Sequence, residues 1–193
     1  MRFLNSAIPS GAIPELYPRV FMNHDAYTDD YIRGILNSVR SFAIVGASAN
    51  TVRPSYFVVK YLLEKNYTVL PVNPGMAGKE ILGQQVYASL RDIPVSVDVA
   101  EIFRNSEAAF GITEEAIEIG AKVVWMQLGV RNDDAARMAE EAGLKVVMNR
   151  CPKIEYARLA GEIGWIGVNS GSISSARPKL APKGVQHRIL RSQ

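Results

Sequence analysis

Apolar residues along the chain gather into short runs that begin near Phe42, Thr68, Val97, Val123 and Val146. Successive runs start 23 to 29 residues apart. An interval of that length holds a short strand, a crossover helix and two turns. The pattern therefore predicts alternating strands and helices from residue 42 onward.

Helical periodicity and capping residues predict the helices around these strands. The first begins at Thr28-Asp29-Asp30 and keeps its apolar positions at helical spacing up to Val39, before the first strand. The later helices are expected from Ser55 to Lys65, from a Ser106 cap through Ile119, from an Asn132 cap through Ala142, and from Pro152 to about Glu162.

Strands that alternate with helices in this way close as a parallel sheet. Parallel strands need right-handed crossovers, which place helices on both faces. We therefore predict an α/β fold, a single Rossmann-like, doubly wound domain with a parallel sheet of about five strands. The domain is expected over residues 28–168, between an N-terminal extension (1–27) and a basic flexible tail (169–193).

Composition places the chain among ordinary globular proteins. It has 193 residues, of which 48% are hydrophobic, and no apolar run approaches the roughly 20 residues that span a bilayer. No secretion signal is recognisable near Met1. The lone cysteine, Cys151, cannot form an internal disulfide. A cytoplasmic protein without membrane contact is expected.

The formal net charge of +3 arises in the last residues of the chain. Residues 171–193 carry basic side chains and no acidic ones, so the remainder has more acids than bases. A basic segment rich in Ser, Gly and Pro predicts a solvated tail. Its charges are not interleaved with aromatic residues, so nucleic-acid binding is not expected. A homo-oligomer and a protein partner both stay open.

The loop from Gly46 to Pro54 is the first candidate for a binding site. Doubly wound proteins bind ligands beyond the carboxyl ends of their strands, beside the first strand. There a glycine lets the backbone approach a phosphate, the first turn of a helix attracts anions, and Arg53 adds a positive charge. For this loop alone, an ordinary turn with Ser55 as the helix cap is the alternative. Later loops at the same edge are Val72-Asn73-Pro74, Phe103-Arg104-Asn105, Gln127-Leu128-Gly129 and Asn149-Arg150-Cys151.

A nicotinamide dinucleotide does not fit these loops. The first turn reads Gly46-Ala47-Ser48-Ala49-Asn50-Thr51 in place of Gly-x-Gly-x-x-Gly. The second strand ends in Val72-Asn73-Pro74, without the acidic residue that holds the ribose of NAD. It also lacks the arginine that would indicate NADP.

Five blocks in order carry a family resemblance: Gly46-Ala47-Ser48, Arg53-Pro54-Ser55, Pro71-Val72-Asn73-Pro74, Trp125 to Val130, and Met148-Asn149-Arg150-Cys151-Pro152. With them the chain resembles the stand-alone CoA-binding-domain proteins over roughly Tyr31 to Gly164. These are similar to the N-terminal CoA-binding domain of the succinyl-CoA synthetase alpha subunit. The resemblance implies a Rossmann-like domain that binds coenzyme A, with the Gly46 loop near the phosphates.

The side chains at this edge agree with such a ligand. Coenzyme A needs an anion site, an apolar adenine slot and a groove for its pantetheine arm. Backbone N–H groups and an arginine can supply the anion site, and apolar residues at the strand ends can supply the adenine slot. The amides of Asn73 and Gln127 can offer hydrogen bonds. The predicted cofactor-binding residues are Gly46, Ala47, Ser48, Arg53, Pro54, Ser55, Val72, Asn73, Pro74, Phe103, Arg104, Gln127, Leu128, Gly129 and Cys151.

Two classes of function remain open. The first is a non-catalytic module for CoA or acyl-CoA that acts as sensor, carrier or accessory subunit. The second is an enzyme, either a detached acyl-CoA synthetase subunit or an NAD(P)-dependent dehydrogenase with an atypical loop. The sequence shows no Ser/His/Asp set and no metal-ligand cluster. Its two histidines, His24 and His187, lie outside the strand-helix repeat, which favours binding without catalysis.

Cys151 is expected on the loop after the fifth strand, just before a helix that Pro152 opens. The helix dipole and Arg150 would favour the thiolate, so we predict a lowered pKa for Cys151. The alternative is a buried cysteine that packs as a small apolar side chain.

Overall fold

A five-stranded parallel sheet forms the centre of the molecule in the computed structural model, which describes residues 21–162. The sheet order is β2-β1-β5-β6-β7. In this doubly wound order the chain adds β2 on one side of β1 and the later strands on the other side, so the strand order reverses beside β1. The order confirms the predicted fold class. The strands are β1 (Ser41–Val45), β2 (Thr68–Val72), β5 (Val99–Ile102), β6 (Val123–Met126) and β7 (Lys145–Val147).

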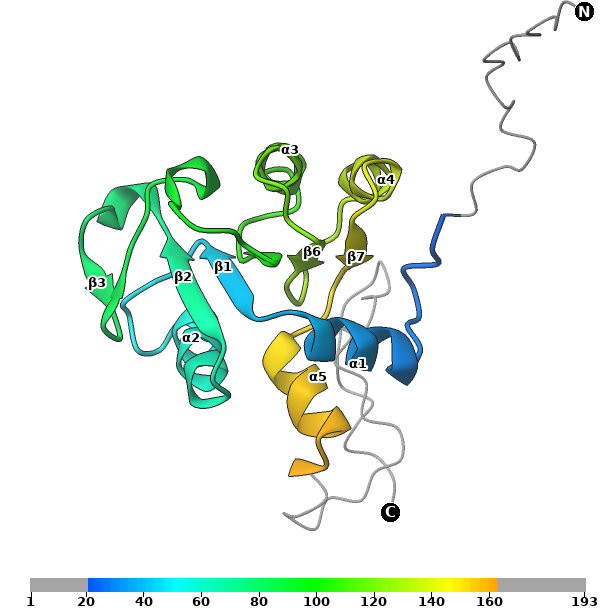
Figure 1. Cartoon of the computed structure of the whole chain (residues 1–193), viewed down its shortest axis with the longest axis horizontal. Coiled ribbons are helices and arrows are strands. Elements are labelled where there is room, and N and C mark those ends of the chain that lie inside the picture. The colour runs from blue at the N-terminus through cyan, green and yellow to red at the C-terminus, as the bar shows by residue number, and fades with distance from the viewer. Residues whose placement is uncertain (1–20, 163–193) are drawn as a thin grey trace, which may run out of the picture.

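Helices cover both faces of the sheet (Figure 1). The helices α1 (Asp29–Ser38), α2 (Pro54–Glu64) and α5 (Pro152–Leu159) lie on one face, and α3 (Ala109–Glu118) and α4 (Asp133–Glu141) lie on the other. Alternate residues of each strand feed two separate cores, as Phe42 and Ile44 pack on the α1 side while Ala43 packs on the α3 side. The strands are apolar on both faces for this reason.

The connection from β2 to β5 differs from the expected crossover helix. Within the described residues it contains two short 3-10 turns, η1 (Pro74–Met76) and η2 (Leu90–Asp92), and a small antiparallel hairpin of β3 (Glu80–Ile81) and β4 (Gln84–Gln85). Gly78 and Gly83 have positive φ angles of 78° and 75°, a backbone conformation that ends helical periodicity. The prediction of a helix in this interval was wrong.

Two of the predicted helix caps are confirmed and one is not. The Thr28 hydroxyl accepts a hydrogen bond from Tyr31 N–H, and the Asn132 side chain accepts one from Ala135 N–H. Ser106 does not cap α3, because its hydroxyl accepts from Arg131 N–H instead. Helix α3 has Ala108 at its N-cap and no side-chain cap, and the Asn105 carboxamide accepts from Ala108 N–H at 3.1 Å in the turn before the helix.

The free edge of β7 is closed by a tyrosine. The Tyr31 hydroxyl donates to Val146 O at 3.1 Å and accepts from Val146 N–H at 3.2 Å. Burial raises the pKa of Tyr31 to about 12, so the hydroxyl keeps the proton that it donates. A side chain thereby satisfies the backbone groups that a further strand would pair.

Tyr31→Phe is expected to destabilise the protein by about 1–3 kcal/mol, because it leaves a partly buried N–H and C=O without partners. Urea denaturation followed by circular dichroism measures the loss. Tyr87→Phe is the matched control, since the Tyr87 hydroxyl makes no hydrogen bond within residues 21–162. Equal stability of the two variants would contradict the assigned role of Tyr31.

Nearly all of the predicted N-terminal extension (1–27) and basic tail (169–193) lies outside the described residues, and the domain boundaries stay a prediction. Residues 21–162 include no helix with the length and apolar character that a membrane crossing requires.

Candidate functional site

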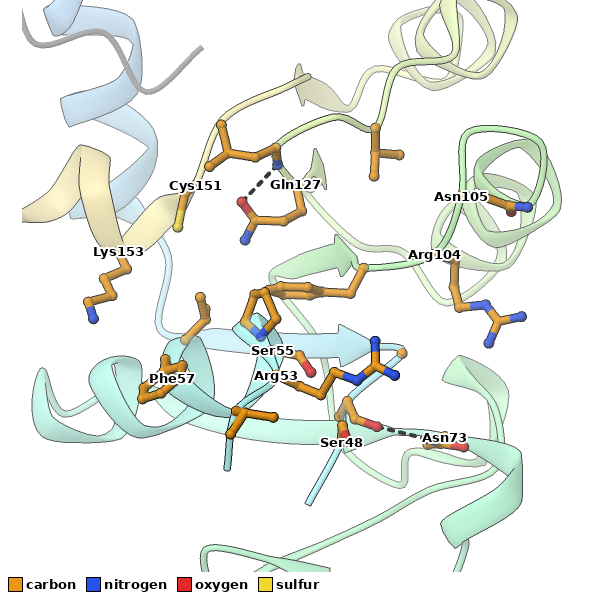
Figure 2. A pocket seen from close by; sticks show the side chains of 18 of the residues that line it. Ser48, Arg53, Ser55, Phe57, Asn73, Arg104, Asn105, Gln127, Cys151 and Lys153 are labelled. Atoms are coloured by element: carbon orange, nitrogen blue, oxygen red, sulfur yellow. Dashed lines mark hydrogen bonds between the residues drawn. The ribbon is translucent and has the colours of Figure 1, made fainter. Parts of the chain in front are cut away.

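A cavity of about 970 Å³ opens at the carboxyl edge of the sheet, on the face that α2 and α5 cover (Figure 2). The first turns of both helices border it, because each helix follows directly on a loop from that edge. Most of the predicted binding residues line this cavity: Gly46, Ala47, Ser48, Arg53, Pro54, Ser55, Asn73, Phe103, Arg104, Gln127, Leu128 and Cys151.

Three predicted residues do not line the cavity. Val72 is 2% exposed and packs in the core on the α3 side of the sheet. Pro74 begins the 3-10 turn η1. Gly129, at a φ of 81°, donates its N–H to the Asn149 side chain at 2.8 Å. These three positions shape the neighbouring loops.

Another part of the lining was not among the predicted binding residues, although Val52 and Asn105 belong to loops that the sequence singled out. It consists of Val52, Phe57, Val58, Asn105, Val130, Lys153 and Ile154. Several of these residues belong to the first turns of α2 and α5. A rule that takes the whole first turn after each strand-end loop would have found Phe57, Lys153 and Ile154.

The backbone N–H groups of the β1–α2 loop make other hydrogen bonds than we expected. The N–H groups of Gly46 and Ala47 both donate to Val72 O, at 2.9 and 3.3 Å. They are therefore not the free phosphate donors that the sequence suggested. Within residues 21–162 the first N–H of this loop without a partner is that of Ser48.

Gly46 allows two loops to meet. Its φ is +94°, and a Cβ at this position would lie 3.2 Å from Arg104 Cδ and 3.3 Å from Phe103 Cβ. A side chain here would be strained by the backbone conformation and would press on the β5 loop. The glycine thus brings Arg104 to the same side of the cavity as the β1–α2 loop.

Asn73 fastens the end of β2 to the same loop. Its amide donates to Ala47 O at 2.7 Å, and its side-chain oxygen accepts from Gly75 N–H at 3.0 Å. These contacts use one N–H and one lone pair of the amide, and a ligand bond from its second N–H stays a prediction. Asn73 therefore sets the shape of the cavity wall.

The first turn of α2 leaves polar groups directed at the cavity. Helix α2 begins at Pro54 after Arg53, which makes no side-chain capping bond, so the alternative of Ser55 as the cap is wrong. Ser55 is 4% exposed, yet its hydroxyl makes no hydrogen bond within the described chain. The hydroxyl oxygen is not among the fully buried unpaired polar atoms of residues 21–162, and Ser55 borders the cavity, where this hydroxyl can bond a ligand.

The charge of the lining is positive. Arg53, Arg104 and Lys153 border the cavity, and its lining residues, all within the described range, include no carboxylate. None of the three forms an ion pair in that part of the chain. Lys153 instead lies near the rings of Phe57 and Tyr61, at 5.8 and 5.6 Å. Residues 21–162 hold more acidic than basic side chains, so the positive charge at the cavity comes from these three residues and not from the net charge of this part of the chain.

Gln127 forms part of the inner wall and is 6% exposed. Its side-chain oxygen accepts from Leu128 N–H at 2.8 Å, and its NH₂ donates to Glu101 Oε1 at 3.0 Å. As with Asn73, the protein orients this amide in the cavity wall, and a ligand bond from its second N–H stays a prediction. Glu101 is fully buried, and burial raises its pKa well above the ordinary value.

The predicted lowering of the Cys151 pKa was wrong. Burial, followed by the nearby Glu101, raises the pKa of the thiol, although the N–H groups of Ile154 and Lys153 oppose the shift. The positive charge of Arg150 is compensated, since its Nε lies 3.7 Å from Glu155 Oε1. Cys151 is 7% exposed, so the alternative of a buried cysteine is the correct one, at a position that borders the cavity.

His24 lies away from the cavity. Its Nδ1 is 2.8 Å from the Tyr27 hydroxyl and its Nε2 is 3.2 Å from Glu140 Oε1. His187 falls outside the described residues. Among residues 21–162 no group of three or more His, Cys, Asp or Glu could hold a metal ion.

Comparison with known families gives one match that spans most of the domain. The family model described as CoA binding domain matches residues 40–157. Among curated proteins, the chain is 36% identical to the uncharacterized protein YneT of Bacillus subtilis (strain 168) over 126 residues, which covers 65% of this chain and 92% of YneT. It is also 36% identical over 89 residues to the alpha subunit of the ADP-forming acetate–CoA ligase I of Pyrococcus furiosus, covering 44% of this chain and 19% of that subunit.

Among solved structures, a hypothetical protein from Pyrococcus horikoshii OT3 superposes with a TM-score of 0.68 at 42% sequence identity. The similarity covers 77% of this chain and 100% of that protein.

Proposed function

The chain belongs to the CoA-binding-domain family, and from this premise we propose that its cavity binds coenzyme A or an acyl-CoA. The observation that carries the proposal is the lining itself, in which Arg53, Arg104 and Lys153 stand without any carboxylate. Coenzyme A carries a pyrophosphate and a 3′-phosphate, so it matches a site with several cations.

We propose that the phosphates of the ligand lie at the first turn of α2. The helix dipole, the uncapped N-terminus and the Ser55 hydroxyl act there together. Arg53 and Arg104 supply the compensating charge from two different loops. A phosphate oxygen can accept a hydrogen bond from the Ser55 hydroxyl, which supports an anion at this place over an apolar group.

We further propose that the protein binds this ligand without catalysing a reaction on it. The lining, within the described residues, contains no histidine and no carboxylate to act as a general base. The raised pKa of Cys151 makes its thiol a weak nucleophile at neutral pH. Since the chain aligns with 19% of the acetate–CoA ligase alpha subunit, the ligase activity of that protein is not carried over.

Coenzyme A is expected to raise the melting temperature by about 5–10 °C at a hundredfold excess over its Kd, because binding to the folded state alone adds about 2.7 kcal/mol. NAD at the same concentration should cause almost no shift, since the end of β2 offers no acidic residue for its ribose. Thermal unfolding with each ligand measures both, and dephospho-CoA tests whether the 3′-phosphate is recognised. A larger shift with NAD or NADP would contradict the proposal and favour a dehydrogenase.

A further inference from the structure

Glu101 is a buried acid that the proposed binding site does not use directly. It is 0% exposed and lies in β5 opposite Ile44 of β1 and Trp125 of β6, neither of which titrates. The titratable group that faces it is Cys151 at the start of α5. Its Oε1 accepts from Gln127, while Oε2 has no hydrogen-bond partner within the described residues.

The hydrogen bonds determine where a proton on Glu101 must sit. The backbone N–H of Leu128 can only donate, so the atom of Gln127 that faces it is the amide oxygen. The NH₂ of Gln127 therefore faces Glu101, and Glu101 Oε1 must accept. The remaining oxygen, Oε2, is the one that carries a proton when the carboxyl group is neutral.

A charge on Glu101 would be costly for two reasons. A fully buried carboxylate without a cation loses its hydration and gains only one hydrogen bond in return. In addition, Gln127, which bonds this carboxyl group, lines a cavity whose cations favour a polyanion. A negative Glu101 would repel such a ligand across a medium of low dielectric constant.

We propose that Glu101, in its protonated form, is a positioning residue that holds the Gln127 amide in the cavity wall, and that anionic ligands bind only while this proton is present. The inference rests on the proposed function for the identity of the ligand, whereas the protonation of Glu101 does not depend on it. Binding and protonation are then linked, so ligand binding is accompanied by uptake of a proton onto Glu101 wherever the ligand-free protein has lost it.

The test compares CoA affinity by calorimetry from pH 6 to pH 9 in the wild type, Glu101→Gln and Glu101→Leu. Glu101→Gln resembles the protonated acid in shape and can still accept from Gln127. We expect it to bind as tightly as wild type at pH 6. Above the pKa of Glu101, wild-type affinity should fall relative to this variant by up to about tenfold per pH unit. The phosphates and thiol of CoA titrate equally in both measurements, so the ratio isolates Glu101.

Glu101→Leu separates positioning from charge. It has no ionisable group but leaves the Gln127 NH₂ without its acceptor, so we expect binding weaker by about three- to tenfold at every pH. Glu114→Gln, an exposed site on α3, is the charge-matched control and should keep the wild-type pH profile. Parallel pH profiles of wild type and Glu101→Gln above the folded-state pKa of Glu101, which the unfolding series below measures, or full affinity in a folded Glu101→Leu, would overturn the proposal.

Unfolding without ligand provides a measurement that does not depend on CoA. A raised pKa means that the folded state holds the proton more tightly than the unfolded chain, so stability is lost as the pH rises above about 4.5. The folding equilibrium constant of wild type relative to Glu101→Gln should fall by about tenfold per pH unit until the folded-state pKa is reached. If CoA binds no variant, the proposed function is wrong, and this series still decides whether Glu101 holds a proton. Equal pH dependence of the two proteins would refute that part.

Discussion

Replacing Arg53 and Arg104 together by alanine is expected to weaken CoA binding by at least about 3 kcal/mol, or more than a hundredfold. The two arginines reach the cavity from different loops, and neither has a carboxylate partner within residues 21–162. A charge-assisted hydrogen bond to phosphate contributes about 1.5–3 kcal/mol. Isothermal calorimetry at fixed salt measures the loss, which should shrink at high ionic strength because exposed charges are screened.

The control for this double variant is Arg33→Ala with Arg137→Ala. Both control arginines lie on helices outside the cavity, in exposed ion pairs with Asp30 and Asp134 at (i, i+3) spacing. The control therefore changes the net charge by the same amount without touching the lining. If it weakens binding as much as the cavity variant does, the effect is long-range attraction and the two arginines are not contacts.

Gly46→Val should abolish measurable CoA binding while the helical circular dichroism signal remains. Valine is strained at a φ of +94°, and its Cβ would press on Phe103 and Arg104 at 3.2–3.3 Å. The β1–α2 and β5 loops would move apart, which separates Arg53 from Arg104. Calorimetry at ligand concentrations a hundredfold above the wild-type Kd is the measurement.

Gly143→Val is the control that separates the effect of backbone strain from the effect of contact between the two loops. Gly143 has a φ of +87°, but nothing lies within 4 Å of a Cβ built there. It should therefore lose stability through the same backbone strain and still bind CoA. Loss of binding in both variants would mean that general destabilisation, and not the contact of the two loops, explains the result. Retained binding in Gly46→Val would remove this loop from the site.

The family resemblance that the sequence suggested is confirmed, and so is the fold class. Both rest on local patterns. Apolar runs at regular spacing predict strands because each strand is buried on both faces, and the Thr28 and Asn132 caps are visible because a cap needs only its own helix. The interval between β2 and β5 was mispredicted, because its spacing fits a helix while its glycines adopt positive φ angles.

The sequence predicted which loops form the candidate site, but it did not predict which hydrogen bonds the side chains of those loops make. The edge of a parallel sheet gathers the loops after each strand, so their positions follow from chain order alone. The use of each polar group does not follow. Whether Asn73 and Gln127 bond a ligand depends on whether Ala47 O, Leu128 N–H or Glu101 lies within reach, and these partners are brought close only by folding.

Cys151 shows most clearly what the sequence determines and what depends on the tertiary structure. By itself the sequence determined that this residue precedes a helix at the ligand edge, since Pro152 opens the helix and the strand spacing places the loop. It could not determine the pKa of the thiol, because sequence reveals the helix dipole and the adjacent Arg150 but not burial or distant neighbours. Tertiary structure added desolvation and Glu101, and it paired Arg150 with Glu155. Desolvation depends on every atom that packs around a group, and so the fold, not the local sequence, decided the chemistry of this residue.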